Sequence, residues 1–313
     1  MVDVSSEGVP VWAAIHTPFT KTGAVDNPGI RSNVRRYIEL GLAGIFCNGL
    51  IGEVWALTVA ERRHVLETIL DEASGRLKVS VVVTATSIPE TLEFGAHARS
   101  VGADSAVLMV PTSGPRSSLQ QVAYFEYVCP RLEMPVVLFN AATAAGSALD
   151  PAAFARISTL PNLTLLKTTA SAAENNALRN VARRGVAVSD PLEENFFGNY
   201  RDFGQRVLFA DPEPYLYQVG TARPIADYIA LLASGRTEEA EAMAARLSDI
   251  RAVFNAWIMD PLRRGHMPGA AVKVWCDLIG MAGGSVRAPL TPLTESERGR
   301  LRADLDRCGL LTA

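Results

Sequence analysis

Short runs of apolar and often β-branched residues recur along the first two thirds of the chain. They are continuous rather than alternating, which is typical of strands in a parallel sheet that is covered by helices. Turn residues and polar segments separate the runs, so each one predicts a single strand. The predicted strands cover residues 11–16, 44–48, 79–85, 105–110, 135–140, 163–168, 185–189 and 206–210.

Amphipathic segments with recognisable helix starts lie between these runs. Thr58 to Glu61 and Ser87 to Glu90 have the spacing of a capping box, in which a hydroxyl and a carboxylate satisfy backbone donors of the first turn. Asp150 before Pro151 is typical of an N-cap followed by proline at the first helical position. Eight strands that alternate with helices predict an α/β fold, a (β/α)8 TIM barrel.

From about Ile225 onward the hydrophobic pattern is wholly helical. We therefore expect a (β/α)8 barrel over residues 1–224 and a C-terminal helical extension, packed on the barrel, over residues 225–313. No low-complexity linker separates the two parts, which favours one folding unit or a tightly docked pair.

Composition and charge narrow the function to small-molecule chemistry. A net charge of −3, with arginines interspersed among carboxylates, gives no general attraction to nucleic acid or to acidic lipid. The four cysteines are far apart and lack metal-ligand spacing, so neither a metal nor a disulfide framework is predicted. No leader pattern or long apolar span is visible, and we expect a cytoplasmic protein that does not bind membranes.

One lysine lies inside a run that otherwise reads as a buried strand. The chain has only four lysines, and Lys167 sits between Leu166 and Thr168 near the end of the predicted sixth strand. Barrel enzymes carry catalytic groups at this rim. Burial disfavours a charged ammonium, and a neutral amine is a nucleophile that can form a Schiff base with a carbonyl. The alternative is a lysine that extends to water or pairs with a carboxylate.

Several segments, in order and spacing, resemble one known family over nearly the whole chain. The segments are "AAIHTPF" at 13–19, "GLAGIFCNGLIGEVWALTVAERRHV" at 41–65, "PVVLFN" at 135–140, "LLKTT" at 165–169 and "PGAAVKVWCDLIGMAGGSVRAPLTPLTESER" at 268–298. With these segments the chain resembles the dihydrodipicolinate synthase and N-acetylneuraminate lyase family of Schiff-base aldolases. The resemblance implies that Lys167 is the Schiff-base lysine, that no metal or organic cofactor is needed, and that the protein is a homo-oligomer, a dimer or tetramer.

The chain departs from the family at the positions that handle substrate. Residues 49–53 read Gly-Leu-Ile-Gly-Glu where the family usually has Gly-Thr-Thr-Gly-Glu, so two hydroxyls are lost, although the amides of Leu50 and Ile51 can still hold an anion. The family's strand-five tyrosine, which relays protons, corresponds to Phe139, and phenylalanine has no ionisable hydroxyl.

Two loops also differ from the family. Ala144 and Ala145 stand where an arginine for a second carboxylate is often found, and Thr112 and Ser113 replace a tyrosine pair. Each lost charge-assisted hydrogen bond is worth roughly 1.5 to 3 kcal/mol. These changes favour a more apolar substrate and argue against a true dihydrodipicolinate synthase or sialic acid lyase.

Other residues would have to move protons in such an enzyme. His16, at the end of the first strand, has a suitable side chain, or is simply satisfied by a backbone carbonyl. Tyr215 or Tyr217, after the eighth strand, supplies a hydroxyl, or is aromatic packing under a loop. Glu53 is expected to brace its loop, and Lys273 to cover apolar surface or pair with an acid.

The sequence therefore predicts a Schiff-base carbon–carbon lyase, aldolase or synthase that acts on an oxo acid or aldehyde. The alternative is a non-catalytic ligand-binding barrel that has lost the proton relay. The predicted catalytic residues are Lys167, His16 and Tyr215, and the predicted substrate-binding residues are Gly49, Leu50, Ile51, Phe139, Asn140, Thr169 and Ser189.

Overall fold

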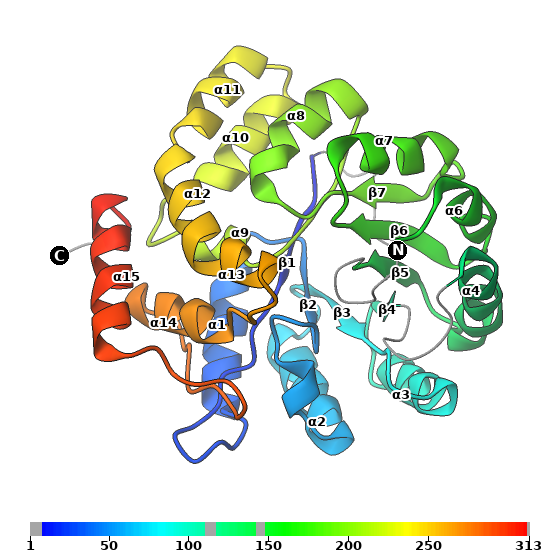
Figure 1. The fold of residues 1–313 in the computed structure, drawn as a ribbon, viewed down its shortest axis with the longest axis horizontal. Coiled ribbons are helices and arrows are strands. Elements are labelled where there is room, and N and C mark those ends of the chain that lie inside the picture. Colours follow the sequence, from blue (N-terminus) through cyan, green and yellow to red (C-terminus); the bar gives the residue numbers. More distant parts are fainter. Residues whose placement is uncertain (1–7, 110–116, 142–147, 312–313) are drawn as a thin grey trace. The chain divides into compact units, whose positions relative to one another are not determined.

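Eight strands and the helices between them form the fold in the computed structural model, which describes residues 8–109, 117–141 and 148–311 (Figure 1). Within these residues the strands form one sheet in the order β7-β6-β5-β4-β3-β2-β1-β8. The fold is a (β/α)8 barrel that continues into a C-terminal helical part, as the sequence predicts. The strands are β1 (Val11–Ala14), β2 (Gly44–Cys47), β3 (Lys78–Val82), β4 (Ser105–Met109), β5 (Val136–Asn140), β6 (Leu163–Thr168), β7 (Ala187–Ser189) and β8 (Leu208–Ala210).

The helices that alternate with the strands begin where the sequence indicates. The two predicted capping boxes, Thr58 to Glu61 and Ser87 to Glu90, are both present, and the Asp150 side chain accepts a hydrogen bond from the amide of Ala153. The helices are α1 (Asn27–Glu39), α2 (Val59–Ala73), α3 (Ile88–Ser100), α4 (Ser118–Leu132), α6 (Pro151–Ile157), α7 (Ala172–Val181) and α8 (Glu193–Phe203).

The remainder of the chain after β8 is helical, which confirms the expectation from its hydrophobic pattern. A π-helical stretch, Asn255–Met259, interrupts this part of the chain. The helices are α9 (Glu213–Leu216), α10 (Pro224–Ala233), α11 (Thr237–Ala245), α12 (Ser248–Phe254), α13 (Asp260–Arg263), α14 (Gly269–Leu278) and α15 (Glu295–Arg307).

By its internal packing the chain divides into two compact units. The first comprises Met1–Trp12 and Lys78–Ala210, and the second comprises Ala13–Leu77 and Asp211–Ala313. The boundary between a barrel and an extension at residue 224 stays a prediction.

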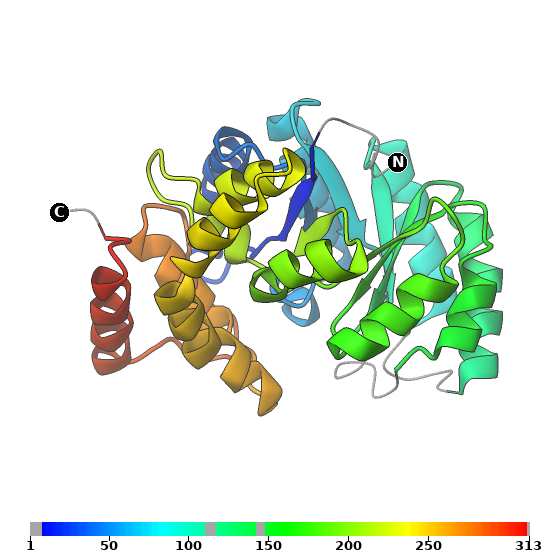
Figure 2. The same cartoon turned by 90° about the horizontal axis from the view of Figure 1, so that it is seen from above.

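In the first unit, β3 to β7 are parallel neighbours and their apolar side chains are buried. Figure 1 and Figure 2 show α3, α4, α6 and α7 on one face of these strands. The register places Phe139 of β5 beside Lys167 of β6, and Lys167 beside Ser189 of β7. The ends of three strands therefore bring three predicted site residues into adjacent positions.

Side chains complete the seam between the short strands β7 and β8. The Ser189 Oγ accepts a hydrogen bond from the amide of Phe209 at 3.0 Å, and it lies 3.2 Å from the carbonyl oxygen of Val207. The Gln205 Nε2 donates to the same carbonyl at 2.9 Å. Polar side chains thus do here what backbone pairing does between the other strands.

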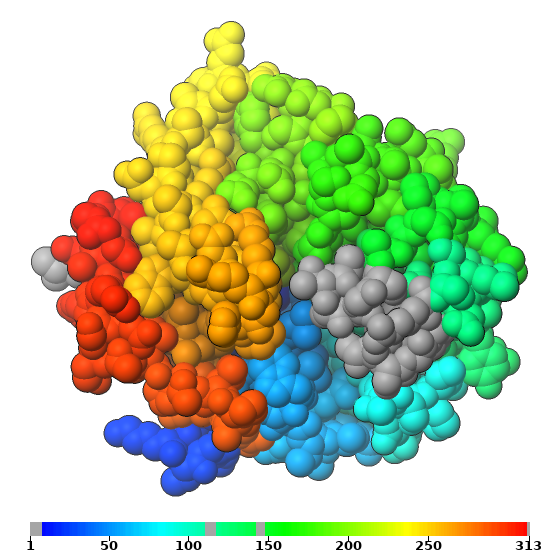
Figure 3. All heavy atoms as spheres, in the orientation of Figure 1, coloured from blue at the N-terminus to red at the C-terminus, as the bar shows by residue number. Residues whose placement is uncertain are grey.

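In the second unit, α1 packs against α2, and the residues after β8 contribute a cluster of aromatic side chains. Trp275 of α14 is fully buried, and its indole donates to the carbonyl oxygen of Leu216 at 3.2 Å. Phe254 and Tyr217 contact the same indole ring. Figure 3 shows the loop near residue 22, in dark blue, against the orange segment before α15.

Candidate active site

Lys167 is the next-to-last residue of β6, close to the carboxyl end of the strand as the sequence predicts. Its side chain is only 1% exposed, so it does not extend to water. The Nζ atom lies 4.4 Å from the centroid of the Phe139 ring. An aromatic face attracts a cation but takes no proton, so the amine has an apolar neighbour at the end of β5.

Asn140 and Thr169 lie at the same strand ends. The Asn140 Nδ2 donates to the hydroxyl of Thr168 at 3.1 Å, and its Oδ1 accepts from the amide of Leu149 at 3.1 Å. The amide of Thr169 lies 3.5 Å from the carbonyl oxygen of Asn140, and the Thr169 side chain is exposed. The structure thus brings Lys167, Phe139, Asn140 and Thr169 together, while their roles toward a substrate stay predictions.

Ser189 and the following Asp190 serve the fold. The hydroxyl of Ser189 is part of the β7 to β8 seam. The carboxylate of Asp190 is buried and accepts from the side-chain amides of Asn175, Asn195 and Asn199 at 3.1 to 3.3 Å. Burial raises the pKa of Asp190. These bonds tie α7 and α8 to the end of β7, and substrate binding by Ser189 stays a prediction.

The turn at residues 49–53 belongs to the second unit. The amides of Gly52 and Glu53 donate to the carbonyls of Gly49 and Leu50, both at 3.1 Å. In the part of this unit that the structure describes, no acceptor takes the amide hydrogens of Leu50 and Ile51. A turn with two such amides is a suitable cradle for an anion.

His16 and Tyr215 lie side by side in the second unit, although each is engaged in the core. The His16 Nε2 lies 2.8 Å from the carbonyl oxygen of Ala282, and because a carbonyl only accepts, Nε2 carries the proton. The other ring nitrogen, Nδ1, faces the Tyr215 hydroxyl at 3.4 Å. Burial lowers the pKa of His16 to about 4 and raises the pKa of Tyr215 well above its ordinary value. These contacts support the alternative of a histidine satisfied by a carbonyl, and catalysis by either residue stays a prediction.

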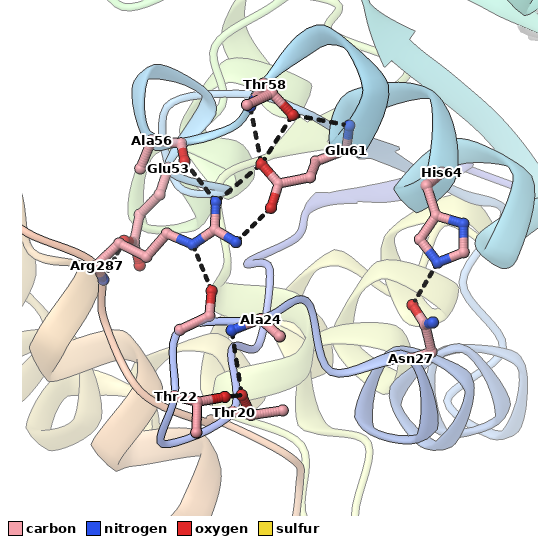
Figure 4. Close-up of polar contacts among 11 residues, drawn as sticks. Thr20, Thr22, Ala24, Asn27, Glu53, Ala56, Thr58, Glu61, His64 and Arg287 are labelled. Carbon is pink, nitrogen blue, oxygen red and sulfur yellow. Dashed lines mark hydrogen bonds and ion pairs between the residues drawn. The ribbon is translucent and has the colours of Figure 1, made fainter.

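A buried ion pair confirms that Lys273 is a partner of an acid. Its Nζ lies 2.5 Å from Glu53 Oε1, and the two side chains are 1% and 0% exposed. Glu53 is the last residue of the 49–53 turn, two positions after Ile51. Arg287 is a further member of this cluster that the sequence analysis missed, because it stands in a loop with no periodic pattern. Its guanidinium binds Glu61 and the carbonyls of Gly23 and Ala56 (Figure 4).

The substituted loop positions Thr112, Ser113, Ala144 and Ala145 lie outside the described residues. Among the residues that the structure does describe, no three His, Cys, Asp or Glu side chains gather to hold a metal ion. The helices of this same part of the chain include none that is both long and apolar enough to cross a membrane.

The fold and the buried lysine together define a class of protein. A (β/α)8 barrel with a lysine at the carboxyl end of β6 has a nucleophile at the rim where such barrels carry their chemistry. The class is therefore that of barrel proteins with a lysine amine at the candidate active site.

The comparison with protein families gives the more particular answer. The chain belongs to the dihydrodipicolinate synthetase family, whose sequence model matches residues 9–308. A 4-hydroxy-tetrahydrodipicolinate synthase of Methanothrix thermoacetophila is 26% identical over 307 residues, which cover 96% of this chain and 97% of that protein. An uncharacterized DapA-like lyase of Halobacterium salinarum is 27% identical over 298 residues, which cover 94% of this chain and 92% of that protein.

Solved structures share the fold at low identity. The prophage protein YagE of E. coli K12, solved in complex with pyruvate, superposes with a TM-score of 0.85 at 22% identity, covering 96% of this chain and 99% of that one. A monomeric dihydrodipicolinate synthase variant has the same TM-score and identity, covering 99% of this chain and 100% of that one. The family thus comprises synthases and lyases, which supports an enzyme and leaves the substrate open.

Proposed function

We propose that this protein is a Schiff-base lyase or aldolase for an oxo acid or aldehyde that is more apolar than the substrates of dihydrodipicolinate synthase or sialic acid lyase. The observation that carries the proposal is Lys167, 1% exposed at the end of β6, with its Nζ 4.4 Å from the Phe139 ring. Membership of a family of synthases and lyases supports it. The buried Phe139 ring supplies the apolar character beside Lys167.

In the proposed mechanism the Lys167 amine attacks the substrate carbonyl and forms a carbinolamine. Loss of water gives a protonated imine, in which the nitrogen accepts the electron pair of the carbon–carbon bond that breaks, or supplies it to the bond that forms. Water then releases the product and restores the amine. The amides of Leu50 and Ile51 are proposed to hold a substrate carboxylate, and the chemistry requires no metal or organic cofactor.

The test is reductive trapping with a panel of carbonyl compounds. The protein is incubated with borohydride and pyruvate, 2-oxobutyrate, phenylpyruvate or an aromatic aldehyde, and its intact mass is measured. We expect one adduct per chain, formed most readily with the apolar compounds. The Lys167→Met variant should form none, and the Lys78→Met variant, which loses an exposed lysine of the same unit, should match the unsubstituted protein. Absence of an adduct with every compound would exclude the proposed chemistry.

Phe139 favours the second candidate function, a barrel that binds a carbonyl ligand without turning it over. A phenyl ring cannot relay a proton, and the His16 and Tyr215 side chains are engaged in the core. Trapping without turnover would support this reading.

The Phe139→Tyr variant distinguishes the two functions. A hydroxyl at this position restores an acid and base beside Lys167, and such a group is worth roughly 10² to 10⁴-fold in rate. We expect the exchange of pyruvate methyl protons with deuterated water, followed by NMR, to accelerate by about 10²-fold. The matched control is Phe139→Leu, which removes the ring and adds no hydroxyl. Equal exchange in both variants would show that proton transfer does not pass through this position.

The proposal extends to the partners of the protein. We propose a small-molecule carbonyl substrate, a cytoplasmic location, and a homo-oligomeric dimer or tetramer, with neither nucleic acid nor membrane as partner. A monomeric synthase variant has the same fold, so the number of subunits has to be measured for this chain. Light scattering coupled to size-exclusion chromatography decides it, and a single species near the chain mass of 33.6 kDa would contradict the oligomer.

A further inference from the structure

The carboxylate of Glu53 is completely buried and is held on several sides. Its Oε1 lies 2.5 Å from Lys273 Nζ, and its Oε2 accepts from the amide of Arg287 at 3.2 Å. A Cβ atom built on Gly269, the first residue of α14, would lie 3.3 Å from Oε1, so this glycine lets the start of α14 approach the carboxylate closely. The partial positive charge at a helix start favours a carboxylate there.

Lys273 is held as tightly as its partner. Its Nζ donates to the carbonyl oxygen of Ser285 at 2.7 Å and lies 4.1 Å from the centroid of the Phe19 ring. The guanidinium of Arg287 lies 4.3 Å from the same ring. Burial lowers the pKa of Lys273, while the hydrogen bond and charge of Glu53 oppose this change. The carboxylate partner thus favours the ammonium form of Lys273 against the effect of burial.

Because Glu53 is the last residue of the 49–53 turn, the contacts of its side chain also restrict the backbone of that turn. Its backbone is left-handed, with φ of 53°, and its amide donates to Leu50 at 3.1 Å. The preceding Gly52 accepts at its carbonyl from the Thr17 hydroxyl at 2.9 Å, and a Cβ on Gly52 would lie 3.2 Å from the carbonyl oxygen of Ile15. The orientation of the Leu50 and Ile51 amides therefore depends on where Glu53 is held.

We propose that Lys273 and Glu53 are positioning residues that fix the 49–53 turn as a carboxylate cradle, so that a helix of the C-terminal part controls the binding of acidic substrates. The inference rests on the proposed function, because it takes the cradle to receive the carboxylate of an oxo acid. The pair acts through the turn and takes no part in the chemistry. Loss of either partner misplaces the two amides and weakens binding of carbonyl compounds that carry a carboxylate.

Trapping kinetics distinguish positioning from general destabilisation. In Lys273→Met and Glu53→Gln we expect the half-saturating concentration of pyruvate to rise about tenfold, with the maximal trapping rate within about twofold. Trapping of acetone, which has no carboxylate, should not change. The control variant Trp257→Phe breaks the 2.7 Å bond from the indole to Asp304 in the same unit, and should leave both compounds unaffected. Equal effects on pyruvate and acetone would overturn the inference.

The double variant Glu53→Gln with Lys273→Met separates stability from positioning. It removes both buried charges, so it should melt at a higher temperature than either single variant. The weakened pyruvate binding should persist, because the turn still lacks the ion pair between Glu53 and Lys273. A half-saturating concentration equal to that of the unsubstituted protein would contradict a positioning role.

Hydrogen exchange tests whether Lys273 and Glu53 fix the 49–53 turn, even if no carbonyl compound is trapped. In Lys273→Met, peptides that cover residues 44–57 should exchange about tenfold faster, while peptides of the first unit should be unchanged. Unaltered exchange in this segment would overturn the inference. Failure of trapping in the unsubstituted protein, by contrast, would refute the proposed function alone.

Discussion

At the scale of the residue, two buried lysines of this chain each face an aromatic ring. Lys273 lies 4.1 Å from the Phe19 ring, and its Nζ is bound by the carboxylate of Glu53 and a backbone carbonyl. Lys167 lies 4.4 Å from the Phe139 ring at the end of a barrel strand. The ion pair gives the first lysine a structural function, whereas the strand end favours chemistry for the second.

The buried His16 side chain should make the stability of the fold depend on pH. Its folded pKa of about 4 lies below the ordinary 6.5, so between these values the unfolded chain binds more protons than the folded one. Stability should therefore fall as the pH drops from about 6.5 to about 4, by about 3 kcal/mol in total. Urea unfolding across this range measures it, and His16→Gln should remove most of the slope. A slope that persists unchanged in the variant would assign it to other groups.

At the scale of the element, Arg287 connects three segments of the second unit. Its guanidinium donates to the carbonyls of Gly23 and Ala56, both at 2.7 Å, and binds the carboxylate of Glu61 in the first turn of α2 (Figure 4). The same carboxylate closes the capping box with Thr58. One side chain thus joins the loop after β1, the turn after β2 and the start of α2.

Removal of this side chain should destabilise the fold measurably. We expect Arg287→Met to lower the free energy of unfolding at pH 7 by about 1 to 3 kcal/mol, because two half-buried carbonyls and the Glu61 carboxylate lose a donor. Arg287 is the main reason that the pKa of Glu61 falls to about 2, so this contribution is present above 4.5 and is lost as the pH falls toward 2. The difference between variant and unsubstituted protein should shrink over that range in urea unfolding.

An exposed ion pair supplies the control for Arg287. The guanidinium of Arg156 binds Glu126 at 2.6 Å, but its side chain is 61% exposed. The variant Arg156→Met should therefore cost less than about 1 kcal/mol. A cost for Arg287→Met no larger than this would contradict the role assigned to its part-buried contacts.

The elements were predictable from local patterns, whereas the contacts between distant segments were not. Each predicted apolar run holds a strand, because burial on both faces leaves a local signature. Glu53 and Lys273 were expected to brace a loop and to pair, but their partnership spans more than 200 positions and has no local signal. Arg287, and the use of Ser189 in the β7 to β8 seam, depend on tertiary packing in the same way.

At the scale of the whole molecule, the C-terminal helices complete the environment of N-terminal residues. Glu53 has its cationic partner on α14, and His16 has its carbonyl partner at Ala282. Within the second unit, residues 13–77 are packed with residues 211–313. A chain that ends before α10 would bury Glu53 without a counter-charge and expose the face that receives Trp275.

Truncation tests this dependence. We expect the fragment of residues 1–224 to lack a cooperative unfolding transition in circular dichroism, because removing one partner of a buried ion pair costs roughly 3 to 5 kcal/mol and the aromatic core is lost as well. A chain that ends at residue 311 is the control and should unfold cooperatively. A cooperative transition in the fragment would show that residues 1–224 are an independent domain.

The central claim is that one amine of this chain reacts with a carbonyl, and mapping the reduced adduct tests it most directly. The chain has four lysines, so digestion and mass spectrometry after borohydride reduction with an oxo acid can assign the modified side chain without ambiguity. We predict modification of Lys167, with Lys273 unmodified because its Nζ is held by Glu53. An adduct on Lys21, Lys78 or Lys273 with Lys167 unmodified would contradict the account.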